Sequence, residues 1–299
     1  MSEINKIFNQ EPEEPIFIIE KDYDEVRPTA NPPKQRMKRW LVRLLKAAAI
    51  FVCFLLALYA YRQWDYYYNI GRVSVSPKEN IEKLQQPVKA ETPQVVMTSD
   101  SLLGVALDLY ALHGLHATLT FEEPDTADTS VYLYCRSCDH RPDKSYHGTL
   151  VVDGKEYQRD QARLGYMAMA DGKQVIGVSR SDKVKDYVME RGGSYFRQFM
   201  LVSDGDIAHH YYLHGKVERR AIGRIGDQLY YIATRNAETL WGFADALREY
   251  GFIDVIYITG GKDYSYYRSA DGQRHDIGDA TEYPNEKWKG IIPWLVFKK

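Results

Sequence analysis

One apolar segment near the N-terminus constrains this 299-residue chain more than any other feature. Residues 47–61 read AAAIFVCFLLALYAY and carry no charge. Extended back to Trp40, the segment has about 22 residues, close to the roughly 20 that a helix needs to cross a bilayer. Arg43 and Lys46 lie inside the extension, and their long side chains can reach the membrane surface. We therefore predict a transmembrane helix over residues 40–61.

The charges beside this segment predict its orientation. Basic residues crowd its N-terminal side, whereas Arg62 is the only basic residue directly behind it. Because positively charged flanks stay in the cytoplasm, we expect residues 1–39 to be a cytoplasmic tail. That tail is rich in Glu, Asp and Pro, so it is expected to be disordered. The bulk of the chain would then lie outside the cytoplasm, in the periplasm if the cell is bacterial.

The sequence after the membrane segment divides into a stalk and a domain. Residues 62–99 contain prolines at 77, 87 and 93 and no sustained hydrophobic period, which predicts a semi-extended stalk. Over residues 100–299, short runs of Val, Ile and Tyr alternate with turn signals. Asp and Gly tolerate the positive φ angles of tight turns, so each such pair predicts a hairpin. The predicted turns are Asp153-Gly154, Asp171-Gly172, Asp204-Gly205, Gly226-Asp227 and Asp271-Gly272.

Two helices are expected within this domain. One is predicted over residues 182–191, before a Gly-Gly pair, and the other runs from near Asn236 to just before Gly251. A buried strand, FIDVIYIT, follows the second helix. The predicted class is therefore α+β, with a mainly antiparallel or mixed sheet built from hairpins with packed helices, preceded by one transmembrane helix.

Composition and motifs exclude several function classes. A formal net charge of -2 argues against a nucleic-acid-binding protein, which normally carries a basic face. The sequence contains no P-loop, nucleophile elbow, zinc-protease motif or dinucleotide-binding fingerprint. We therefore expect no cofactor.

Cys135 and Cys138 form a C-x-x-C pair within the segment CRSCDH. The spacing after the second cysteine does not match a zinc finger and no second pair exists, so no metal is expected. A disulfide and two free thiols both remain open. A redox centre would need the pair to open a helix, whereas here it ends a predicted strand.

Two further polar groups are candidates for a site. Alternation along the segment HHYYLHGK places His210 and His214 on one strand face, where a metal-binding role, an acid/base role and simple exposure all remain open. Arg219 and Arg220 follow Glu218. Adjacent arginines are often ion-paired on a surface, but in a cleft they suit phosphate binding through forked hydrogen bonds.

Three segments in this order resemble the phosphodiester glycosidase domain family: FMLVSDGDI, RRAIGRIGDQLYYIAT and TLWGFADALREYGFIDVIYITGG. The likeness covers most of residues 100–299. It implies an α+β fold with a polar cleft where an arginine, a glycine turn and an asparagine-containing segment meet. On this resemblance, Arg219 matches the family arginine, and Gly260 and Gly261 match the glycine turn.

The chain departs from the family pattern at functional positions. Thr259 stands where the family has an acidic residue, and Lys262-Asp263 follow the glycines. The segment Cys135-Arg136-Ser137 falls where the asparagine would lie. Glycoside cleavage normally needs carboxylates, so Asp263 is the candidate replacement.

The leading hypothesis is a membrane-anchored, extracytoplasmic protein that binds or hydrolyses a glycan or glycosyl phosphodiester. Arg219 and Asp263 are its catalytic candidates, with substrate contacts from Gly260, Gly261, Arg136 and His214 and sugar stacking on Tyr264, Tyr266 and Tyr267. The alternative is a catalytically inactive binding or scaffolding module with a protein partner in the cell envelope. A redox role for the cysteine pair is a third hypothesis.

Overall fold

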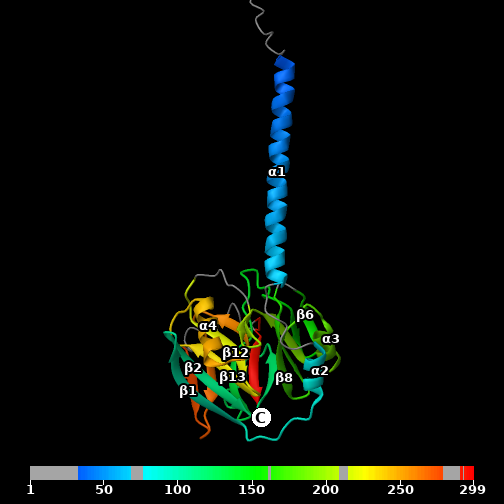
Figure 1. Ribbon diagram of the computed structural model, residues 1–299. Helices are drawn as coiled ribbons and strands as arrows, with labels where there is room; N and C mark the ends of the chain where they lie inside the picture. The colour runs from blue at the N-terminus through cyan, green and yellow to red at the C-terminus, as the bar shows by residue number, and fades with distance from the viewer. Residues whose placement is uncertain (1–32, 69–76, 161–162, 209–214, 279–289, 292) are drawn as a thin grey trace, which may run out of the picture. The chain divides into compact units, whose positions relative to one another are not determined.

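The computed structural model describes residues 33–68, 77–160, 163–208, 215–278, 290–291 and 293–299 (Figure 1). The chain divides into two compact units, one ending at Ala60 and the other spanning Tyr61–Lys299, and each is described by itself. Helix α1 (Pro33–Tyr68) holds a stretch, Met37–Tyr61, that is long and apolar enough to cross a membrane. Every side chain in this stretch is exposed, as a helix surrounded by lipid requires. The predicted apolar N-terminal helix is confirmed.

Among the described residues, the strands of the second unit form three sheets of seven, five and five strands. All pairs of neighbouring strands are antiparallel. The first sheet has the order β1 (Gln94–Leu102), β2 (Val105–His113), β13 (Gln228–Thr234), β12 (Arg219–Ile225), β14 (Asp254–Gly260), β10 (Met200–Ser203), β11 (Asp206–Ile207). The second has the order β16 (Arg274–Ile277), β15 (Ser265–Arg268), β4 (Val131–Arg136), β17 (Trp294–Lys298), β3 (His116–Thr120). The third has the order β6 (Lys155–Gln158), β5 (Leu150–Val152), β9 (Ser194–Gln198), β7 (Gly165–Ala170), β8 (Lys173–Val178).

One hydrophobic core joins the three sheets. It takes Ile222 from the first sheet, Leu133 from the second and Phe196 from the third, all fully buried. Helix α4 (Leu240–Tyr250) buries one apolar face against the other side of the seven-stranded sheet. Helices α2 (Pro77–Gln85) and α3 (Lys183–Glu190) pack on the third sheet through a separate apolar cluster. The predicted α+β class is confirmed.

The Asp-Gly hairpins are confirmed, with a clear physical signature. Asp153, Asp171 and Asp204 have φ angles of 48°, 53° and 54°, and the glycine after each is also positive. Two successive positive φ angles define the turn that matches the right-handed twist of a hairpin. Leu103 and Gly104 make the same turn between β1 and β2, with φ angles of 52° and 80°. Sequence reasoning missed that hairpin because a leucine rarely adopts this conformation.

The two predicted helices in the domain are found, with one shifted start. Asp182 and Arg191 flank α3 as predicted. Helix α4 begins at Leu240, because the Oγ1 of Thr239 accepts a hydrogen bond from the Gly242 N–H and caps it. Asn236, where the helix was predicted to begin, lies in a bend, and Glu238 forms a bridge to Val217 before the helix starts.

The described part of residues 62–99 differs from the expected stalk. Helix α2 buries Leu84 in the core of the third sheet, and the Asn80 side chain donates to the Ile176 carbonyl oxygen. Strand β1 pairs with β2 over its whole length, beginning at Gln94. The prolines that suggested an extended stalk lie instead at the first position of a helix and in a short connection, where proline is well tolerated.

Candidate functional site

Three segments that are distant in sequence meet at the end of β14. The Thr259 Oγ1 donates a hydrogen bond of 2.9 Å to Asp139 Oδ1, and the Gly260 N–H donates to the same carboxylate. Arg136, the last residue of β4, places its Nη1 3.9 Å from Oδ1 of Asp263. The segments predicted to form a polar cleft therefore come together, and they bring Asp139 with them. We call Arg136, Asp139, His140, His147 and Asp263 the polar cluster.

A short hairpin carries most of this polar cluster. The His147 N–H donates to the Asp139 carbonyl oxygen at 3.1 Å, and His140 pairs with Tyr146 across the loop. Arg141 ties the hairpin down, with Nη1 2.6 Å from the Tyr146 carbonyl oxygen and Nη2 3.0 Å from an oxygen of Asp160. The loop after β4 is therefore a fixed support for Asp139.

Asp263 lies beneath this hairpin as a fully buried carboxylate. Its Oδ1 accepts a hydrogen bond of 2.9 Å from the Tyr264 N–H, but its buried Oδ2 has no hydrogen-bond partner among the described residues. Burial raises the pKa of Asp263 to about 6, against the opposing effect of the Arg136 and Arg220 charges. A buried acid with one unused oxygen is uncommon away from functional sites.

Asp139 and His140 are partly exposed and face the same guanidinium. Burial raises the pKa of Asp139, opposed by the Thr259 hydrogen bond and by the charge of Arg136. Burial, reinforced by Arg136, lowers the pKa of His140 to about 4. The Nη2 of Arg136 is 3.0 Å from His140 Nδ1, and because a guanidinium only donates, Nδ1 accepts and the ring proton is assigned to Nε2. His140 is therefore neutral at pH 7.

The two adjacent arginines on β12 point to opposite faces of their strand. Arg219 directs its guanidinium to the Glu238 carbonyl (3.0 Å), the Gly215 carbonyl (2.8 Å) and the Tyr257 hydroxyl (3.3 Å). Arg220 directs its guanidinium to the Gly261 carbonyl (2.7 Å) and to Glu218 (3.0 Å). Both are buried, whereas 11% of the Arg136 side chain remains exposed. Arg136 is thus the arginine best placed to meet a ligand.

The glycine turn has its amides engaged within the protein. Gly260 lies opposite Arg219, and a Cβ there would be 2.3 Å from the Tyr257 hydroxyl oxygen, so only glycine fits. Gly261 has a φ of 88° and donates its N–H to the Glu218 carbonyl at 2.9 Å. The Gly260 N–H donates to the Asp139 carboxylate, so a side chain of the protein occupies the place expected for a ligand anion. The remaining predicted contact, His214, lies outside the described residues.

The cysteine pair and two of the tyrosines are interior residues. Cys135 and Cys138 are buried free thiols, and burial raises the pKa of Cys138 to about 12. The proposed sugar stacking on Tyr264 and Tyr266 is not available, because both side chains are buried in an aromatic cluster on the second sheet. Tyr267 is partly exposed, but its ring stacks on His275 at 4.9 Å.

Sequence reasoning missed Asp139, His140 and His147 as site residues. They lie in or just beyond the CRSCDH segment, which was considered for its cysteine pair and for Arg136 but not for its Asp and His residues. Within the described ranges, no group of three or more metal-ligating side chains is found. The available signal was a cluster of ionisable residues directly after a buried strand.

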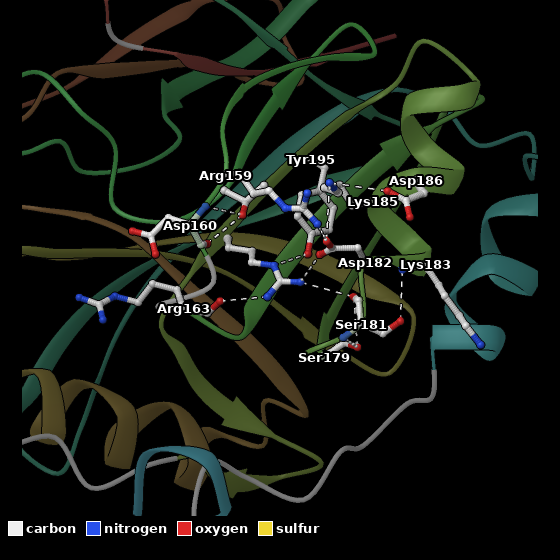
Figure 2. A network of polar contacts seen from close by, with 12 residues as sticks. Arg159, Asp160, Arg163, Ser179, Ser181, Asp182, Lys183, Lys185, Asp186 and Tyr195 are labelled. Carbon is white, nitrogen blue, oxygen red and sulfur yellow. Dashed lines mark hydrogen bonds and ion pairs between the residues drawn. The ribbon is translucent and has the colours of Figure 1, made fainter. Parts of the chain in front are cut away.

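A second network of charges surrounds the start of α3 (Figure 2). The buried Arg197 donates from Nε to the Tyr195 hydroxyl at 2.9 Å and from Nη2 to Asp182 Oδ1 at 3.1 Å. The other oxygen of Asp182 receives Arg159 at 2.7 Å and lies 3.7 Å from the Lys185 Nζ. We call these residues the α3 network.

A cavity of about 610 Å³ lies elsewhere, between α2, the connection to β1 and the turn between β7 and β8. None of the polar cluster lines it. We place the candidate site at the polar cluster because that is where ionisable groups with shifted pKa values converge.

Comparisons with known proteins give no match to a protein-family model and none to a curated protein. Solved structures do match. The catalytic domain of a zebrafish N-acetylglucosamine-1-phosphodiester alpha-N-acetylglucosaminidase, auto-inhibited by its pro-peptide, is 12% identical with a TM-score of 0.49, covering 72% of this chain and 85% of that one. A hypothetical protein from Synechocystis is 9% identical with a TM-score of 0.51, covering 72% of this chain and 64% of that one. At this identity, the Synechocystis likeness supports the fold alone.

Proposed function

We propose that the second unit is an extracytoplasmic, membrane-tethered phosphodiester glycosidase-like domain that acts on a glycosyl phosphodiester at the polar cluster. The observation that carries this proposal is the Arg136 guanidinium, partly exposed and set between the buried Asp263 and the ordered hairpin that holds Asp139. A planar guanidinium can donate two parallel hydrogen bonds to a phosphate. The resemblance of the β12 and β14 segments to the phosphodiester glycosidase domain family supports the same ligand class.

Arg136 is the cation of the polar cluster that a bound anion would meet. Arg136 is positive, while His140 is neutral and its Nδ1 accepts a hydrogen bond from the guanidinium. Asp263 holds the guanidinium from beneath at 3.9 Å. When the buried carboxyl binds a proton, the cluster gains one positive charge, so a phosphodiester is bound more tightly.

The proposal moves the anion-binding role from Arg219 to Arg136. Because Arg219 already donates to two carbonyl oxygens, we assign it the task of holding the end of β14 beside residues 215 and 238. Gly260 keeps its predicted place in the site, since its missing side chain lets the Tyr257 hydroxyl approach. His214 and Asp263 stay as proposed contributors, Asp263 from below the binding surface.

The test is a panel of α- and β-linked hexose 1-phosphate methyl esters, offered to the full chain in detergent micelles. Binding is measured by calorimetry and sugar release by chromatography. We expect saturable binding that weakens at least about tenfold in Arg136→Met, the effect of one lost charge-assisted contact. Arg159→Met, which removes an exposed arginine of the α3 network, is the matched control and should bind as the native chain does. Equal affinities in the native chain and Arg136→Met would overturn the proposal.

A second candidate function is a catalytically inactive module that binds a partner in the cell envelope. The observation that favours it is Thr259 at the position where the family carries an acid, with the nearby Asp263 fully buried. Cross-linking in intact cells would recover one partner protein, while the purified chain would bind but not cleave any ester in the panel. Hydrolysis of any ester would exclude this function.

The location outside the cytoplasm is proposed from the basic residues on the N-terminal side of the apolar stretch. A C-terminal alkaline phosphatase fusion, which folds only in an oxidising compartment, should be active. If the phosphatase fusion is inactive and a separate C-terminal fusion to green fluorescent protein is fluorescent, the domain lies in the cytoplasm and the proposed orientation is wrong.

A further inference from the structure

Two carboxylates of the polar cluster differ in what can reach them. The Asp263 side chain is fully buried, so neither water nor a ligand touches its oxygens. Asp139 is partly exposed and lies beside the same guanidinium. Of the two, only Asp139 can act directly on a bound molecule.

Asp139 is also held in one orientation. Its Oδ1 accepts from the Thr259 hydroxyl at 2.9 Å, and its carboxylate also accepts from the Gly260 N–H. Its own carbonyl oxygen accepts the His147 N–H at 3.1 Å, which fixes the backbone on the other side. A carboxylate held by two hydrogen bonds from the end of β14, on a backbone fixed by a third, meets the requirement that a reacting group be positioned before the ligand arrives.

The neighbouring histidines are poorer candidates for proton transfer. Nδ1 of His140 faces the Arg136 guanidinium and cannot receive a proton while that contact lasts. Burial lowers the pKa of both His140 and His147, which weakens them as bases.

We propose that Asp139 is the general base that activates water in hydrolysis of a glycosyl phosphodiester at this site, an inference that rests on the function proposed above. The carboxylate takes one proton from water as the water oxygen bonds to the anomeric carbon. The bond from that carbon to the phosphate oxygen breaks, and its electron pair leaves with a phosphate monoester. Arg136 balances the added negative charge, and the proton on Asp139 then passes to solvent. The configuration at the anomeric carbon is inverted.

Several charged groups face Asp139 and shape its titration. Burial raises the pKa of Asp139, opposed by the Thr259 hydrogen bond and by Arg136 and His147. Asp263 and the Tyr257 hydroxyl, from the segment after β14 and from β14 itself, interact with its negative charge. The rate should fall as the pH is lowered through the pKa of Asp139, because the protonated acid cannot accept a proton from water.

The experiment uses the full chain in detergent and the tightest-binding ester of the panel. We expect Asp139→Asn to lower kcat at least about 100-fold without weakening binding, and to lose the acidic limb of the pH profile. Sodium azide, a nucleophile that needs no base, should restore turnover in Asp139→Asn and yield a glycosyl azide. Asp139→Glu should retain part of the rate. Asp143→Asn, an exposed carboxylate on the same hairpin, should match the native chain.

The outcomes separate this inference from the proposed function. Binding without turnover in the native chain, an unchanged kcat in Asp139→Asn, or retained anomeric configuration would each overturn the role of Asp139 and leave ligand binding standing. No binding by the native chain would overturn both. Loss of turnover in Asp139→Asn with intact binding and azide rescue would support the general base, since a merely misfolded site would not be rescued.

Discussion

Two arginine–aspartate groups in the same folded unit, each with one fully buried partner, behave differently. In the α3 network, Arg197 is fully buried, and both oxygens of Asp182 receive cations, at 3.1 Å and 2.7 Å. In the polar cluster, Arg136 lies 3.9 Å from Asp263, whose second oxygen has no hydrogen-bond partner in the part of the chain that the structure describes. Both oxygens of Asp182 are therefore bonded within the fold, whereas among the described residues Oδ2 of Asp263 is not.

The difference separates a structural role from a functional one. A buried ion pair whose polar atoms are all bonded holds its elements in place, here the start of α3 against β9. A buried carboxyl with an unused oxygen lowers stability unless it binds a proton or a further partner. Stability given up at one place in a fold often marks a site kept for function.

The largest expected effect is on the satisfied network. Arg197→Met should lower the free energy of unfolding by about 3 kcal/mol, because it removes the fully buried guanidinium that holds Asp182 and Tyr195. Arg159→Met removes an exposed partner of the same carboxylate and should cost less than about 1 kcal/mol. Urea denaturation followed by tryptophan fluorescence measures both. If both substitutions lower the free energy of unfolding equally, the burial of Arg197 does not make its ion pair stronger than that of Arg159.

Asp263→Asn should raise the free energy of unfolding near neutral pH, whereas the arginine substitutions lower it. The pKa of Asp263 is about 6 in the folded chain and close to its usual 3.8 when unfolded, so the folded state binds the proton more tightly. Its contribution to stability is therefore full below pH 4 and lost as the pH rises through 6, by about 3 kcal/mol at most. The asparagine variant should match the native chain at pH 4 and exceed its stability at pH 7.5. A constant difference across this range would contradict the raised pKa.

A smaller effect is expected at His140, which accepts a hydrogen bond from Arg136. Replacing it by leucine removes one contact that orients the guanidinium, so phosphodiester affinity should fall about fivefold, or about 1 kcal/mol. His140→Gln keeps an acceptor and should recover most of this loss. Calorimetry with the same ester would reveal identical affinities if His140 does not position Arg136.

The smallest effect concerns the cysteine pair. Because Cys135 and Cys138 are buried thiols with raised pKa values, a thiol reagent should leave both unmodified in the folded chain at pH 8. Unfolding without reductant should expose both, counted in a Cys53→Ser background. If no thiols appear until a reductant is added, the pair forms a disulfide.

The sequence predicted the parts of this fold that depend on local rules. The apolar composition of residues 47–61 and the positive φ angles allowed to Asp153-Gly154 are enough to place a membrane helix and a hairpin. Strand β1 was missed because it begins in a proline-containing segment. The turn that joins it to β2 contains Leu103, and leucine is not a residue that indicates a turn.

The site was predicted only in part, because its members come from separate elements. Arg136, Asp263 and Gly260 were proposed through the resemblance to the phosphodiester glycosidase domain family. The hydrogen bond from the Thr259 hydroxyl to Asp139 joins residues 120 positions apart, and no local sequence pattern predicts such a contact. The sequence also did not show which of Arg219 and Arg220 faces the candidate site. Adjacent strand residues point to opposite faces, and both arginines are buried.

The most direct test of a phosphodiester site at the polar cluster is a ³¹P NMR titration of the full chain in detergent with a hexose 1-phosphate methyl ester. The phosphorus signal should shift saturably with the native chain and with Arg197→Met at a temperature where that variant stays folded. Arg136→Met should raise the ester concentration that gives half of the shift at least about tenfold. An unchanged titration curve in Arg136→Met, or no shift with the native chain, would contradict the account that the polar cluster, rather than the α3 network, holds the ligand.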